Sequence, residues 1–147
     1  SAATQAGGVV ANAPETQIDA LFAYGDALGI AFQIADDLLD YQGDSAATGK
    51  NVGDDLSEGK PTLPLIYTMR EGSGEQAALV RTAIQKGGIE DLESIRNAVE
   101  AAGALDYTAQ QARDFAERAI SCLDALQPSE YRDALIELSR FAVARTH

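Results

Sequence analysis

The chain has 147 residues, of which 46% are hydrophobic, so it is long enough for one domain with a core and is not a disordered tail. Its formal net charge of −12 argues against nucleic acid as a partner, because phosphates would be repelled over most of the surface. The single cysteine, Cys122, excludes an internal disulfide and favours a cytoplasmic location. No uninterrupted apolar run approaches the roughly 18 residues of a membrane span, so we expect no transmembrane segment.

The first half of the chain is dominated by one long predicted helix. Small residues form a short helix up to about Asn12, and the long helix follows from Pro14 to about Tyr41. A Gly-, Ser- and Asp-rich break over residues 42–60 should contain at most one helical turn. The stripe of the long helix that we expect to face inward consists of Ile18, Phe22, Gly25, Gly29, Phe32/Gln33, Asp36 and Asp40.

The second half is also predicted to be helical. A helix should open at Pro61 and Thr62, and another, capped by Ser73, should follow it. Further helices are expected over about residues 90–102 and 106–126, and after Pro128. No alternating strand pattern and no internal repeat are present, so the predicted fold is all-α, a bundle of about seven helices.

Three aspartates sit at the end of the long helix. Asp36 and Asp40 are four residues apart and therefore share a face, about 6 Å apart along the axis, whereas Asp37 points about 100° away. Like charges at this spacing destabilise a helix by a few tenths of a kcal/mol, and desolvation adds to the cost. A divalent cation would remove the conflict, and carboxylate oxygens suit Mg²⁺. The alternative is a solvated acidic patch.

A lysine-bearing loop follows the aspartates. Residues 1–49 contain no Lys or Arg, and Lys50 and Lys60 then each follow a glycine. The loop is not a Walker A motif, because its Gly–Lys spacing is one residue too long and a helix precedes it. It is also not an EF-hand, since the required Gly and Glu are missing. Glycine permits a close approach of the backbone and lysine attracts phosphate oxygens, so the loop suits a phosphorylated ligand.

The run "GIAFQIADDLLDY", followed by "GK" and "GDDLSEGKPTLPLIY", resembles the second aspartate-rich motif and downstream loop of trans-isoprenyl diphosphate synthases, the polyprenyl synthetase family. The resemblance is close over residues 1 to about 72. The phrases "EGKPTLPLIY" and "ELSRFAVAR" are similar to the long-chain bacterial branch. This resemblance implies an isoprenoid synthase-type helical bundle around a central cavity.

The resemblance also implies roles for individual residues. Asp36 matches the principal Mg²⁺ ligand, Asp37 and Asp40 match the other two acids of the motif, and Asp54 matches a loop aspartate in the outer shell of the same ion. Lys50 matches the lysine that grips the allylic diphosphate, and Lys60 matches a second basic position. Phe32 and Gln33 match a pair that lines the cavity beneath the metals. Asp36 and Lys50 would thus be the catalytic residues.

The implied activity is the Mg²⁺-dependent condensation of an allylic prenyl diphosphate with isopentenyl diphosphate, which gives a long-chain trans-polyprenyl diphosphate and releases diphosphate. A cytoplasmic homodimer is expected. The family's first aspartate-rich motif is not found, so we expect residues 1–147 to be the C-terminal portion of a single polyprenyl synthetase domain, inactive alone.

Three alternatives remain. A class I terpene synthase would carry Asn and Ser/Thr metal ligands, and this motif has only aspartates. A non-catalytic partner subunit of a heteromeric prenyltransferase would tend to have an eroded motif, and this motif is intact. The third is a plain helical interaction module.

Overall fold

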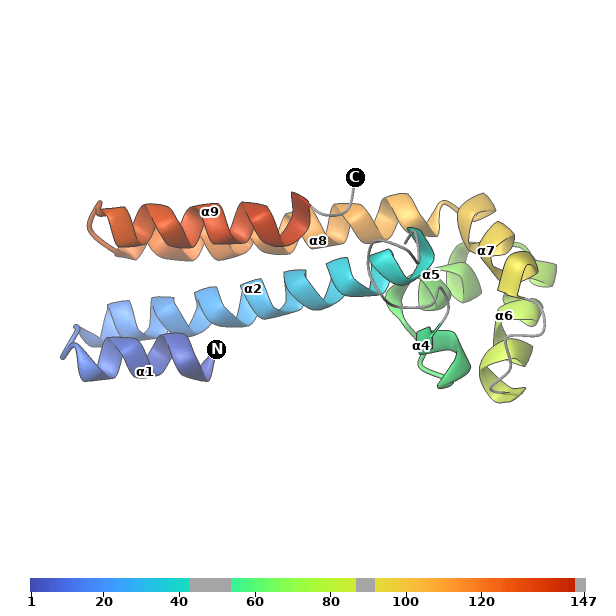
Figure 1. The fold of residues 1–147 in the computed structure, drawn as a ribbon, viewed down its shortest axis with the longest axis horizontal. Helices are drawn as coiled ribbons and strands as arrows, with labels where there is room; N and C mark the ends of the chain where they lie inside the picture. The colour runs from blue at the N-terminus through green and yellow to red at the C-terminus, as the bar shows by residue number, and fades with distance from the viewer. Residues whose placement is uncertain (43–53, 87–91, 145–147) are drawn as a thin grey trace. The chain divides into compact units, whose positions relative to one another are not determined.

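The computed structural model describes residues 1–42, 54–86 and 92–144, and all regular structure in these ranges is helical (Figure 1). The all-α prediction is therefore confirmed. The helices are α1 (Ala2–Val10), α2 (Glu15–Gln42), α4 (Asp54–Ser57), α5 (Leu63–Glu71), α6 (Gly74–Lys86), α7 (Leu92–Ala101), α8 (Ala104–Cys122), the short 3₁₀ helix η1 (Leu123–Ala125) and α9 (Glu130–Ala144).

The described helix ends agree with the predicted ones within a few residues. The long helix α2 starts directly after Pro14. Ser73 caps α6 as predicted: its backbone N–H donates to Gln76 Oε1 (2.7 Å), and the Gln76 N–H donates to Ser73 Oγ (3.3 Å). The largest difference is at α8, which begins at Ala104 and tightens into η1 after Cys122. Such a 3₁₀ turn is common at the end of an α-helix.

The chain divides into two compact units, Ser1–Ala35 with the chain from Gln111 onward, and Asp36–Gln110. In the first unit, α1 lies against the beginning of α2 (Figure 1). A Cβ on Gly8 would meet the side chains of Leu21 and Ile18 at 3.1 and 3.2 Å. Between the two helices, Asn12 has φ 51°, a left-handed conformation that asparagine tolerates better than most residues. The chain can therefore reverse within a few residues.

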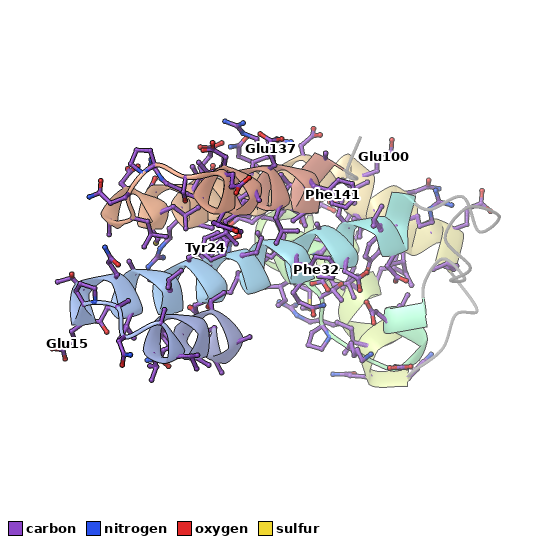
Figure 2. The ribbon with its side chains drawn as sticks, turned by 60° about the vertical axis from the view of Figure 1, so that its left-hand side comes forward. Glu15, Tyr24, Phe32, Glu100, Glu137 and Phe141 are labelled. Atoms are coloured by element: carbon purple, nitrogen blue, oxygen red, sulfur yellow. The ribbon has the colours of Figure 1, made fainter. Side chains whose placement is uncertain are left out.

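The core of the first unit joins α2, α8 and α9. Its fully buried members are Tyr24, Ala27, Ala119 and Leu123. Tyr24 lies between α2 and α9 (Figure 2), and its hydroxyl donates to the Leu135 carbonyl at 3.0 Å. This hydroxyl group is buried, and desolvation raises the pKa of Tyr24 above its ordinary value of 10.0.

The predicted inward stripe of α2 is wrong. The buried residues are Tyr24, Ala27, Ala31, Ala35 and Leu38, which lie on roughly the opposite side of the helix from the expected stripe. Within that expected stripe, Phe22 is 42% exposed and Phe32 50% exposed, and Gly29 is exposed as well.

Helix separation explains the difference, because side-chain size sets how closely two helices approach. Alanines leave little side chain between helices, and α8 also buries a run of small residues. These are Ala112, Ala116 and Ala119. On α9, Leu138 and Phe141 are exposed, whereas Ser139 and Ala142 are buried. On both helices, small residues make up part of the contact, together with larger ones such as Tyr24.

The second unit has its own core. Buried side chains from α2, α4, α5, α6, α7 and α8 meet in one cluster, namely Tyr41, Leu56, Leu65, Val80, Ala83, Ile95, Val99 and Ala104. Next to it, Tyr67 and Tyr107 stack with ring centroids 4.3 Å apart, and the Arg70 guanidinium lies 5.6 Å from the Tyr67 centroid. The short helix α4 is anchored to this core through Leu56, which is fully buried.

Length and composition alone would allow the stretch Glu15–Tyr41 to cross a membrane. The core helix of a soluble protein meets the same criterion. In α2 the buried face made by Tyr24, Ala27 and Ala31 accounts for part of the apolar character. The absence of a transmembrane segment stays a prediction.

Replacing Leu65 tests the core of the second unit. Leu65→Ala removes a fully buried side chain and should lower the free energy of unfolding by about 2–5 kcal/mol. Ile66→Ala is the matched control, because Ile66 is 43% exposed and should cost no more than about 1 kcal/mol. Chemical denaturation of the two variants checks this, and equal losses would contradict the described packing.

Tyr24 predicts a pH dependence of stability. Its folded pKa lies above the unfolded value near 10, so the neutral hydroxyl is favoured in the fold. The contribution is fully present below pH 10 and is lost as the pH rises through the folded pKa. Tyr24→Phe should therefore lose less stability than the parent protein as the pH rises above about 10. Denaturation curves across this range measure the difference, and parallel profiles would contradict it.

Candidate functional site

The three aspartates lie on the last turns of α2, which continues to Gln42. Asp36 and Asp37 are half-buried, and Asp40 is 6% exposed. Because the helix is unbroken through all three, the predicted one-turn relation between Asp36 and Asp40 holds. Asp36 and Asp40 lie on the side of the helix that carries Phe22 and Phe32, and Asp40 is nevertheless buried. A carboxylate in such a position is costly unless other groups compensate its charge.

Tyr41 follows Asp40 and is 2% exposed. Its hydroxyl lies 3.2 Å from Thr62 Oγ1, and either oxygen can donate the hydrogen bond. Burial raises the pKa of Tyr41 well above its ordinary value of 10.0, and the negative charges of Asp40, Asp55 and Asp37 raise it further, while the bond to Thr62 acts against them. The hydroxyl therefore stays protonated, and the aspartates of α2 and α4 are close enough to act on the same group.

Lys60 lies beside acids of the α4 segment. Its ammonium group contacts Asp55 Oδ1 at 3.2 Å and the Glu58 carboxylate at 2.5 Å. The hydrogen bond from Lys60 lowers the pKa of Glu58, and the bonds to Glu58 and then Asp55 raise the pKa of Lys60. The lysine is 57% exposed, so solvent screens these pairs and they add little stability. A ligand anion could replace them at small cost.

The other predicted site residues are either exposed or outside the part of the chain that the structure describes. Lys50 lies outside the described residues. Asp54 begins α4, but its side chain lies outside the described part. Phe32, labelled in Figure 2, and Gln33 are exposed on α2. Within residues 1–42, 54–86 and 92–144, no three His, Cys, Asp or Glu side chains are grouped closely enough to hold a metal ion. The metal and substrate roles of these residues stay predictions.

Three residues near the aspartates were not singled out from the sequence, namely Tyr41, Thr62 and Asp55. A signal existed for two of them. Tyr41 directly follows the aspartate motif, and Thr62 stands where the α5 helix begins, a position that often carries a capping side chain. Here Thr62 makes no side-chain cap hydrogen bond, and its hydroxyl meets Tyr41 instead. A long-range hydrogen bond of this kind has no sequence spacing that would predict it.

Comparison with known proteins gives consistent matches. The model of the family described as polyprenyl synthetase matches residues 1–102. The chain is 48% identical over 145 residues to octaprenyl diphosphate synthase of Escherichia coli, covering 98% of this chain and 45% of that protein. It is 46% identical over 143 residues to the geranyl-diphosphate-specific all-trans-nonaprenyl-diphosphate synthase of Rhodobacter capsulatus, covering 97% and 44%.

Solved structures agree with the sequence matches. A decaprenyl diphosphate synthase from Rhodobacter capsulatus superimposes with a TM-score of 0.89 at 42% identity, covering 99% of this chain and 46% of that one. A polyprenyl synthase from Caulobacter crescentus, complexed with calcium and isoprenyl diphosphate, gives 0.89 at 39% identity, covering 99% and 45%. The chain spans about half the length of the relatives it matches. On the family match and these identities, the chain belongs to the polyprenyl synthetase family.

Proposed function

We propose that this chain supplies the second aspartate-rich half of the active site of a trans-polyprenyl diphosphate synthase. The reaction would be a head-to-tail condensation of an allylic prenyl diphosphate with isopentenyl diphosphate, in which diphosphate is released. The observation that carries the proposal is the placement of Asp36 and Asp40 on successive turns of α2 in a member of this family. The bacterial octaprenyl and nonaprenyl synthases among its relatives support a long-chain product. A cytoplasmic homodimer is the form we propose.

The residues present fit a hard divalent cation. Asp36 and Asp40 offer only oxygen donors, from one face of one helix, and Asp37 stands next to them. Mg²⁺ typically takes one or two carboxylates and completes its shell with water and substrate phosphates, so a complete set of protein ligands is not required. We propose Mg²⁺, held by Asp36 and Asp40, with Asp37 and Asp54 outside its immediate ligands. When bound, it supplies Lewis-acid stabilisation of the departing diphosphate.

The other residues act on the substrate directly. Lys50 and Lys60 bind diphosphate oxygens of the allylic substrate, and the Lys60 ammonium group must then exchange its contacts with Asp55 and Glu58 for them. Positive charge held beside the departing group favours ionisation of the allylic carbon–oxygen bond.

The apolar side of α2 has a second role. Phe22 and Phe32 are exposed on the face that leads along the helix to Asp36, and Gln33 stands beside them. We propose that this face lines the path of the growing apolar chain and keeps water away from the carbocation. The calcium and isoprenyl diphosphate held by the Caulobacter relative are consistent with this class of ligand.

Asp36→Asn in the full-length synthase tests the metal role. The amide keeps the shape of the side chain and removes its charge, so the condensation rate should fall by at least about 10²-fold, as for removal of other groups that stabilise transition-state charge. Asp26→Asn is the control, because Asp26 is an exposed acid of the same helix and its replacement should leave the rate unchanged. Turnover that persists unchanged in Asp36→Asn would contradict the proposed metal role.

Enzyme kinetics can test the proposed roles of Lys50 and Lys60. Lys50→Ala should raise KM for the allylic diphosphate by about tenfold and change KM for isopentenyl diphosphate much less, since a phosphate contact is lost on one substrate only. Lys60→Ala should also raise KM for the allylic diphosphate more than KM for isopentenyl diphosphate, but by a smaller factor. The reason is that the Lys60 ammonium group also pairs with Asp55 and Glu58. Lys86→Ala, in an exposed position at the end of α6, is the control. Steady-state kinetics with each substrate varied measures these effects, and equal losses for both substrates would refute the assignment.

A further inference from the structure

The Tyr41 hydroxyl joins two segments that carry the charged groups of the proposed site. The first is the last turn of α2, where Asp40 directly precedes Tyr41. The second begins at Lys60, two residues before Thr62, whose hydroxyl oxygen lies 3.2 Å from that of Tyr41. The two bonded residues are 21 positions apart in the chain and both are buried, Tyr41 at 2% and Thr62 at 7% exposure.

The connection continues from Thr62 to the acids of α4. The Thr62 N–H donates to the Lys60 carbonyl at 3.0 Å, and the Lys60 N–H donates to the Asp55 carbonyl at 2.9 Å. The Lys60 ammonium group also contacts the Asp55 carboxylate at 3.2 Å. The aspartate end of α2, the lysine and α4 are therefore linked by consecutive hydrogen bonds that pass through the Tyr41–Thr62 pair.

Apolar packing holds the ring of Tyr41, and with it this chain of hydrogen bonds, in place. It packs in the core cluster of the second unit, which also contains Leu56 of α4 and Leu65 of α5. Tyr41 is one residue from the end of α2, and helix ends fray because their last carbonyls lack partners within the helix. A side chain anchored both by packing and by a hydrogen bond holds the turn that carries Asp40.

We propose that Tyr41 and Thr62 are positioning residues that hold the aspartates of α2 and Lys60 in register for a common diphosphate–metal ligand. The inference rests on the proposed function. Neither residue contacts the substrate in this scheme. Each acts through its neighbour, Tyr41 through Asp40 and Thr62 through Lys60. Loss of either hydroxyl would loosen the last turn of α2 and leave the packing of the ring and of α5 in place.

Two substitutions in the full-length synthase remove one hydroxyl each: Tyr41→Phe keeps the ring, and Thr62→Val keeps the branched shape. Each should raise the Mg²⁺ concentration for half-maximal condensation about tenfold, the lower end of the range for residues that orient metal ligands. The double variant should be no worse than either single one, because the two hydroxyls form one bond. Hydrogen exchange without metal should show faster exchange of the backbone amides of residues 38–42 in both single variants.

Two controls separate positioning from general stability. Thr62→Ser keeps the hydroxyl and should retain the parental Mg²⁺ requirement. Tyr24→Phe also removes a buried tyrosine hydroxyl, the one bonded to Leu135, and should lower the melting temperature without changing the Mg²⁺ requirement. If Tyr41→Phe does not fold, the comparison of Thr62→Val with Thr62→Ser decides the question alone.

The outcomes of these experiments separate the positioning role of Tyr41 and Thr62 from the proposed function. If Asp36→Asn is inactive while Tyr41→Phe and Thr62→Val keep the parental Mg²⁺ requirement and amide exchange, the positioning role is overturned and the proposed function stands. An effect of the double variant equal to the product of the single ones would also overturn it. If Asp36→Asn remains active, the proposed function itself fails.

Discussion

The repulsion between the carboxylates at the end of α2 is the constraint on which the site depends. Asp36 and Asp40 are separated by one helical turn, and Asp37 adds a third negative charge beside them. Asp40 is also almost fully buried, which makes its charge more costly than that of a surface acid. These repelling carboxylates lie next to a core of buried side chains, and that core includes Tyr41. The packing of the second unit can therefore stabilise an arrangement of acids that the helix alone would disfavour.

Two different interactions support the aspartate end of α2. Apolar packing holds the ring of Tyr41, and it would tolerate phenylalanine equally well. The hydroxyl adds direction, because its hydrogen bond with Thr62 relates α2 to the segment that leads into α5. The exposed ion pairs of Lys60 contribute little stability, and for that reason they can yield to a ligand. Stability and the proposed ligand contacts thus depend on separate groups of this small region.

Local sequence patterns predicted the helices well, and they failed on which face of α2 is buried. Helix ends follow capping residues and helix breakers such as Ser73 and Pro14, whose effects act over a few residues. The buried face of α2 depends on the partner helix. Phe22 and Phe32 carry more apolar surface than the alanines do, yet the alanines are buried, because α8 presents small residues in return. Where a helix is apolar on most sides, periodicity does not single out one stripe.

The sequence by itself determined the all-α class, the approximate helix limits and the one-turn spacing of Asp36 and Asp40, because each follows from interactions between residues near one another in the chain. Its motifs also indicated the family, to which the matches assign the chain. Only the tertiary structure decided that Asp40 is buried, that Lys60 pairs with Asp55 and that Tyr41 meets Thr62. These facts depend on how separate helices pack, and no local spacing encodes the distance between side chains that meet only in the folded chain.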